Sequence, residues 1–191
     1  MLETKNILLV GVGGQGIILA SKVLSKGLVD AGFDVKMSEV HGMAQRGGSV
    51  TTQVRYGEKV YSPIIGKGQA DILVAFEKME AMRWIEYLKP SGKLVVNNYS
   101  IPSVPVLIGQ VKYPEDIIEE LKEKVDTTVI DAANAARELG NIRTQNIIML
   151  GALVKALNIT EVNWEEAIKD TVKEKYVDIN LKAFDRGMEL V

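Results

Sequence analysis

The chain has 191 residues, of which 47% are hydrophobic and 25% are charged, and its formal net charge is -2. This composition is typical of one globular domain with a substantial core, and the near-neutral charge argues against nucleic acid as a partner. No apolar run approaches membrane-spanning length and the N-terminus lacks a signal sequence, so the sequence predicts a cytoplasmic protein with no membrane partner.

The chain contains no cysteine and a single histidine, His41. The absence of cysteine excludes disulfides, a thiolate nucleophile and any cysteine-ligated zinc or iron–sulfur cluster within this chain. One histidine is also too few for a multi-histidine metal site. If the protein belongs to a redox system, the metal must therefore lie on another polypeptide.

The first half of the chain alternates between strand and helix patterns. Continuous apolar runs predict buried strands, apolar residues at helical spacing predict a helix, and residues 49–56 alternate between two faces as a strand does. After Gly57, residues 59–62 are predicted to return as the second strand of a hairpin. The predicted elements are strand 7–10, helix 14–31, strand 33–40, strand 49–56 and return strand 59–62.

The second half continues the alternation and then becomes helical. The prolines of residues 101–114 predict extended segments, and Asp131 is well placed to cap the helix that follows it. The predicted elements are strand 71–76, helix 77–88, strand 93–97, helix 114–124, strand 127–130, helix 132–139 and an all-helical part from Arg143 onward. We therefore expect a single domain over residues 1–191, with a three-layer Rossmann-like α/β fold, a mostly parallel sheet, a β-hairpin insertion and a helical C-terminal part over residues 141–191.

The loop after the first strand carries the spacing Gly11-x-Gly13-x-x-Gly16, in the strand–loop–helix context of a dinucleotide fingerprint. Glu39, at the end of the second strand, is a candidate for the ribose-binding acid. Three features argue against this interpretation: the extra Gly14 and polar Gln15, a second strand that leads into a glycine-rich loop and not a helix, and no acid/base set for hydride transfer. The alternative is a tight turn that serves helix–sheet packing.

Two loops and several later segments together resemble the gamma-type domain of the 2-oxoacid:ferredoxin oxidoreductases. The similarity extends over nearly the whole chain, and the run from Glu39 to Gly48 is especially similar to the small subunits that act on indolepyruvate. Relatives that act on pyruvate or 2-oxoglutarate share the glycine loop and the Arg-Gly-Gly segment. The segments that carry the resemblance are 11–20, 39–50, 61–63, 70–77, 146–151 and 180–187.

The resemblance implies a division of labour between subunits. In this family a large alpha subunit carries thiamine diphosphate, Mg²⁺ and the iron–sulfur clusters, and the complex converts a 2-oxoacid to an acyl-coenzyme A while electrons pass to ferredoxin. The resemblance therefore implies a non-cluster subunit that binds no cofactor by itself and is inactive alone. The cysteine-free sequence agrees with this expectation.

The resemblance also suggests candidate site residues. Gly11, Gly13, Gly14 and Gly16 would shape a loop that faces the large subunit or its substrate channel, with Gln15 offering hydrogen bonds there. The list of candidates is completed by Arg46, Gly47, Gly48 and His41.

Among these, Arg46 is the strongest candidate, because its planar guanidinium suits a substrate carboxylate, a coenzyme A phosphate or an acid of the partner. An intrachain pair with Glu39 is the alternative. Gly47 and Gly48 would permit close approach of the backbone or a positive φ. His41 is either a structural hydrogen-bonding residue or a catalytic candidate, but no partner base or nucleophile is evident.

Three functions remain open from the sequence. The first is a non-cluster subunit of a 2-oxoacid ferredoxin oxidoreductase, with an arylpyruvate such as indolepyruvate as substrate, or alternatively pyruvate or 2-oxoglutarate. The second is a free-standing NAD(P)- or FAD-binding Rossmann protein. The third is an assembly module that uses the same fold without redox chemistry.

Overall fold

The protein is described by a computed structural model that covers residues 3–42 and 47–191. Its centre is a six-stranded sheet in the order β2-β3-β1-β4-β5-β6. The strands are β1 (Lys5–Val12), β2 (Asp34–His41), β3 (Ser49–Gly57), β4 (Ala70–Ala75), β5 (Leu88–Asn97) and β6 (Asp126–Ile130).

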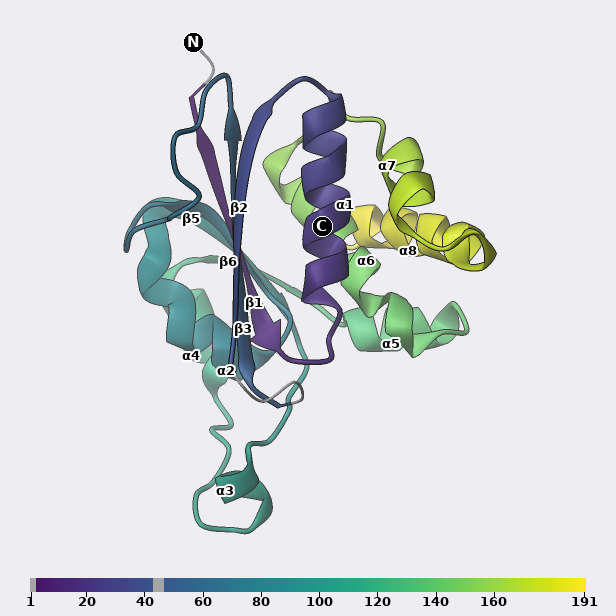
Figure 1. The fold of residues 1–191 in the computed structure, drawn as a ribbon. Helices are drawn as coiled ribbons and strands as arrows, with labels where there is room; N and C mark the ends of the chain where they lie inside the picture. Colours follow the sequence, from purple (N-terminus) through teal and green to yellow (C-terminus); the bar gives the residue numbers. More distant parts are fainter. Residues whose placement is uncertain (1–2, 43–46) are drawn as a thin grey trace.

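Helices cover both faces of the sheet, which gives the three layers predicted from the sequence (Figure 1). The helices α1, α5, α6, α7 and α8 lie on one side, and α2 and α4 lie on the other. Their bounds are α1 (Ile17–Asp30), α2 (Lys78–Trp84), α3 (Val104–Leu107), α4 (Ile117–Lys124), α5 (Ala132–Glu138), α6 (Gln145–Leu157), α7 (Trp164–Thr171) and α8 (Val177–Glu189), with 3-10 turns η1 (Ile85–Tyr87), η2 (Ile142–Thr144) and η3 (Glu174–Tyr176).

The sheet is mostly parallel, and β3 is the strand that runs the other way. β1 pairs with β4, β4 with β5 and β5 with β6 in parallel, whereas β3 is antiparallel to both β1 and β2. The predicted alternation of β3 is confirmed, because Val50, Val54 and Tyr56 all belong to the core beneath α1 and α6. The hairpin of the fold is therefore β2–β3.

The prediction of a return strand at residues 59–62 was wrong. Both edges of β3 are already bonded, to β1 and to β2, so no edge remains for a further strand. The segment after β3 instead crosses one face of the sheet and is held by side chains. Arg55 Nη1 donates to Ser62 O at 2.9 Å, and Ile65 N donates to Gln53 Oε1 at 2.6 Å.

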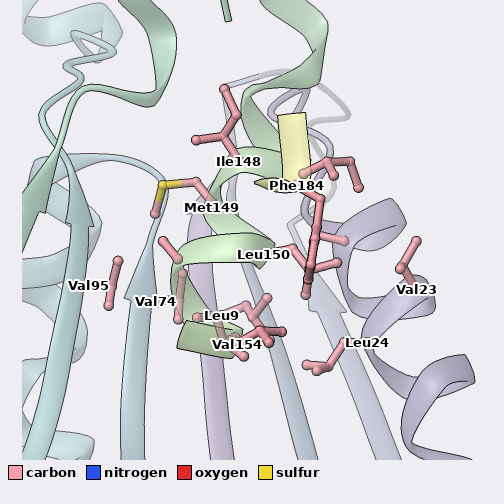
Figure 2. Close-up of a cluster of buried hydrophobic side chains, with 14 of the residues drawn as sticks. Leu9, Val23, Leu24, Val74, Val95, Ile148, Met149, Leu150, Val154 and Phe184 are labelled. Atoms are coloured by element: carbon pink, nitrogen blue, oxygen red, sulfur yellow. The ribbon is translucent and has the colours of Figure 1, made fainter. Parts of the chain in front are cut away.

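The core is divided by the sheet into two apolar clusters, as the strand alternation requires. Ile7 and Leu9 of β1 face the α1/α6 side, whereas Leu8 and Val10 face the α2 side. Figure 2 shows how α6 fills the larger cluster: its residues Ile148 to Val154 lie between the central strands and the side chains of α1 and α8. A helix that is buried on nearly every face belongs to the interior of the domain.

Two helical predictions needed adjustment. The predicted helix 77–88 is shorter, because α2 ends at Trp84 and Leu88 already begins β5. Residues 101–114 contain the helical turn α3 in place of a fully extended segment, and Pro105 in its first turn has the φ that a helix start needs. Asp131 caps α5 as predicted: its Oδ1 accepts from Asn134 N at 2.9 Å.

We call residues 98–116 the excursion, because they leave the carboxyl end of β5 and carry α3 away from the body before α4 begins (Figure 1). Within the described ranges, no helix is long and apolar enough to cross a membrane.

Candidate functional site at the glycine-loop edge

Strand register brings the two sequence loops together. His41, the last residue of β2, pairs with Val50 of β3, and Val50 pairs with Gly11 of β1. The end of β1 and the β2–β3 connection therefore meet at one edge of the sheet. Gly13 N closes the contact by donating to Gly48 O at 2.8 Å.

A hollow of about 440 Å³ lies at this edge. It is lined by the loop 13–18 together with Val12, His41, Gly42 and Val50. His41 is exposed, so its imidazole is accessible from solvent. The lining is apolar apart from the loop backbone, Gln15 and His41, and it contains no charged carboxylate or ammonium group among the described residues.

Gln15 does not face a ligand as expected but is turned into the protein. Its side chain is buried, its Oε1 accepts from Val12 N at 2.8 Å, and its Nε2 donates to Phe76 O at 2.7 Å. The carboxamide thus connects the end of β1 to the end of β4. Gln15 fixes the shape of the glycine loop from the inside.

The glycines of the loop are needed for two different reasons. Gly16 has φ +78°, and a Cβ there would lie 2.7 Å from Asn146 Nδ2. Gly11 has no room for a side chain, because a Cβ would lie 2.7 Å from Gln15 Oε1 and 2.8 Å from Phe76 Cβ. A loop with these requirements accepts very few other residues.

Asn146 is a site residue that the sequence reasoning did not single out. It lies in the first turn of α6, is nearly fully buried, and donates from Nδ2 to Gly16 O at 3.1 Å. The asparagine lies in the 146–151 segment of the resemblance, but 130 residues separate it from Gly16, so no local pattern connects the two.

Glu77 is a second residue that was missed, and it controls the excursion. Its side chain is 1% exposed. Its Oε2 accepts from Glu80 N at 3.0 Å and caps α2, while its Oε1 accepts from Ile101 N at 3.1 Å and from the Tyr113 hydroxyl. One carboxylate therefore holds both ends of the excursion. The signal in the sequence was an acid directly after a buried strand.

The Glu77 contacts define a second, larger hollow next to the first. It has a volume of about 840 Å³, and its lining includes Val12 and Ser49 as well as the excursion. Ser49 Oγ donates to Glu80 Oε2 at 2.6 Å. Burial, and then the bond to Glu77, raise the pKa of the Tyr113 hydroxyl, so this phenol stays protonated and serves as a donor.

The geometry disfavours the dinucleotide interpretation. In a dinucleotide fold the second strand neighbours the first, but here β3 lies between β1 and β2, which moves Glu39 away from the glycine loop. Glu39 Oε1 accepts from Ser21 Oγ at 3.4 Å. The Gly13 and Gln15 amides, which would face a pyrophosphate, donate to Gly48 O and Val12 O.

The described residues do not fit thiamine diphosphate or its metal either. The Gly13 and Gln15 amides are occupied as above, and over residues 3–42 and 47–191 no three His, Cys, Asp or Glu side chains are grouped to hold a metal ion. Arg46, the strongest candidate from the sequence, lies outside the described residues. Gly47 has φ +80°, as its predicted conformational role requires.

The fold and the site define a Rossmann-like α/β domain. Its glycine loop is held by hydrogen bonds from buried side chains of the same chain and lies at one edge of the sheet. The chain belongs to the pyruvate ferredoxin/flavodoxin oxidoreductase family, which it matches over residues 6–190. This result confirms the family resemblance noted in the sequence.

Similar proteins place the chain more finely within that family. The indolepyruvate oxidoreductase subunit IorB of Pyrococcus horikoshii is 40% identical, and the match covers 98% of this chain and 96% of the relative. The 2-oxoglutarate synthase subunit KorC of Methanothermobacter thermautotrophicus is 34% identical, with 100% and 97% covered. The solved gamma subunit of a keto/oxoacid ferredoxin oxidoreductase from Geobacter sulfurreducens has a TM-score of 0.71 at 26% identity, with 97% of each chain covered.

Proposed function

We propose that this chain is the non-cluster subunit of a 2-oxoacid ferredoxin oxidoreductase that acts on indolepyruvate or a related arylpyruvate. The chain is 40% identical to a full-length indolepyruvate oxidoreductase subunit, and it has no cysteine to hold a cluster. The large partner would bind thiamine diphosphate, Mg²⁺ and the iron–sulfur clusters, and the complex would use coenzyme A and ferredoxin in the cytoplasm. This subunit would be inactive alone.

The structural observation that supports assembly with a partner subunit is the exposed apolar tip of the excursion. Val104 is 68% exposed, Leu107 70%, Ile108 62% and Val111 54%. Contiguous apolar side chains at this exposure are typical of a surface that a partner covers. Because Glu77 fixes both ends of the excursion, the tip is held in place next to the glycine loop.

The role of each site residue follows from this placement. Gly11, Gly13, Gly14 and Gly16 shape the edge that faces the large subunit, and Gln15 holds that shape. Gly47, Gly48 and His41 border the same edge. We propose that Arg46 reaches across it to an anionic group, which is a substrate carboxylate, a coenzyme A phosphate or an acid of the partner.

The test is reconstitution with the large thiamine-dependent subunit, followed by an assay of viologen reduction with indolepyruvate, thiamine diphosphate and coenzyme A. Leu107→Lys should weaken co-purification by tenfold or more, because about 1.4 kcal/mol is tenfold in affinity and a buried charge costs more than this. Val29→Lys is the matched control, since Val29 is 53% exposed on α1, away from the proposed edge.

Arg46→Ala, with Arg137→Ala as the exposed control, tests the remaining site residue. We expect turnover to fall for Arg46→Ala and to stay unchanged for Arg137→Ala.

Micromolar binding of NAD(H) or FAD by the purified chain would contradict the proposal and favour a free-standing nucleotide enzyme. Faster turnover of pyruvate or 2-oxoglutarate than of indolepyruvate would keep the subunit role and change the substrate.

A further inference from the structure

A third hollow, a cleft of about 440 Å³, lies on the helical side of the molecule, where η2 and the start of α6 meet the Thr171–Asn180 segment. Its size is within the range of roughly 300–1,000 Å³ that small-molecule sites occupy. Nothing in the proposed subunit role uses it.

The charged side chains that line this cleft are both cations. Arg143 and Lys173 line it, no Asp or Glu does, and neither cation forms an ion pair with any residue of the described chain. The nearby acids Glu174 and Asp178 are exposed and lie outside the lining. Two unpaired cations at one hollow favour an anionic ligand.

The N-terminal end of α6 adds to this preference. Thr144 and Asn146 place the start of α6 in the lining, and the thirteen-residue α6 has no acid in its first turn. Asn180 is 6% exposed and donates from Nδ2 to Tyr176 O at 2.7 Å, whereas its Oδ1 makes no hydrogen bond within the described ranges. The Oδ1 atom is an acceptor and does not attract a carboxylate, so the preference for an anion rests on Arg143, Lys173 and the start of α6.

The remaining wall is apolar. It is lined by Leu19, Val172 and Tyr176. Lys175 Nζ lies over the Tyr176 ring, 4.9 Å from its centroid. An inorganic anion would leave this wall in contact with water, whereas an organic anion with an aromatic or aliphatic body would cover it.

We infer that this cleft binds a small organic carboxylate with an apolar body: the carboxylate pairs with Arg143 and Lys173, and the body lies against Leu19, Val172 and Tyr176. The inference does not depend on the proposed subunit role, because it rests on a different set of residues.

The experiment uses the full chain and two probes of equal shape, phenylacetate and its neutral analogue phenylacetamide. Binding is followed by ¹H–¹⁵N NMR, with the Thr144 and Lys173 backbone amides and the Asn180 side-chain amide as reporters. Phenylacetate should shift these signals in a saturable manner, and phenylacetamide should bind at least roughly fivefold more weakly, because one exposed charge pair contributes up to about 1 kcal/mol.

Variants separate the cleft from the rest of the surface. Arg143→Gln and Lys173→Gln should each weaken phenylacetate binding by roughly fivefold. Lys155→Gln is the matched control, because Lys155 is an exposed cation at the other end of α6.

Equal binding of acid and amide would overturn the inference, as would equal losses in the control variant. Shifts that map to residues 13–18 in place of the cleft would also overturn it. If the assembled complex no longer binds phenylacetate, the cleft is a subunit contact and the inference is again wrong.

Discussion

At the scale of single residues, the glycine loop owes its shape to two buried amide side chains. Gln15 ties the loop to the ends of β1 and β4, and Asn146 holds it from α6 through Gly16 O. A buried carboxamide with both ends bonded is costly to lose, because its partners would remain unpaired away from water. The loop is therefore a fixed part of the domain and is not rearranged easily.

Replacement of Gly16 tests how tightly the loop is held. Gly16→Ala should lower the free energy of unfolding by about 2–3 kcal/mol, because both the positive φ and the contact with Asn146 Nδ2 oppose a Cβ. Urea denaturation provides the measurement. Gly68→Ala is the control: Gly68 has φ +69° with no atom within 4 Å, so only the backbone cost of about 1 kcal/mol remains. Equal losses in the two variants would mean that the Asn146 contact contributes nothing.

At the scale of elements, the excursion is set in place by one acid. Glu77 caps α2 and also accepts from Ile101 N and the Tyr113 hydroxyl, so the helix and both ends of the excursion share one carboxylate. An exposed segment with few core contacts would otherwise be among the first parts of a domain to open. The shared Glu77 carboxylate therefore holds the excursion in a defined position on the domain.

Loss of the Tyr113 hydroxyl should loosen this element without unfolding the domain. Tyr113→Phe keeps the ring but removes a hydrogen bond to a charged group, which costs about 1.5–3 kcal/mol. We expect faster amide hydrogen exchange over residues 101–113 and little change in β1 or α6. Tyr61→Phe serves as the comparison because Tyr61 is 89% exposed. Unchanged exchange in the excursion would show that the hydroxyl does not hold it.

The elements also show where sequence reasoning succeeds. Helix α1, the strands β1 to β4 and β6, the second half of β5 and the Asp131 cap follow from periodicity and local chemistry, which act over a few residues. The return strand at residues 59–62 was wrong because it depended on which strands occupy the edges of β3. Glu77 and Asn146 were missed for the same reason, since their partners at Ile101 and Gly16 are distant in sequence.

At the scale of the whole molecule, we propose that residues 1–191 form one folding unit. The C-terminal helices do not form a separate body, because α6 is buried against the central strands and its neighbours (Figure 2). Gly151 and Gly187 allow α6 and α8 to approach so closely that a Cβ on Gly151 would lie 2.2 Å from Phe184 O.

Truncation checks this proposal. A chain that ends at Gly140 loses the helices that cover the larger core cluster, so Leu9, Val74 and Val95 would be exposed to water. We expect this fragment to lack cooperative thermal unfolding and to bind hydrophobic dyes, as measured by calorimetry and fluorescence. A sharp, two-state transition in the fragment would show that residues 141–191 are a separate domain.

The place of β1 in the sheet has a consequence for how the chain is made. Ile7 pairs with Val54 on one side and with Ile72 on the other, so the first strand of the chain to be made must wait for both of its neighbours. Until β3 has emerged, the apolar run Ile7–Val10 has no native strand partner, and until residue 75 has emerged it has a partner on one side only. Contacts this distant in sequence form slowly. We expect nascent chains shorter than this to be a preferred target for chaperones that hold unfolded apolar segments.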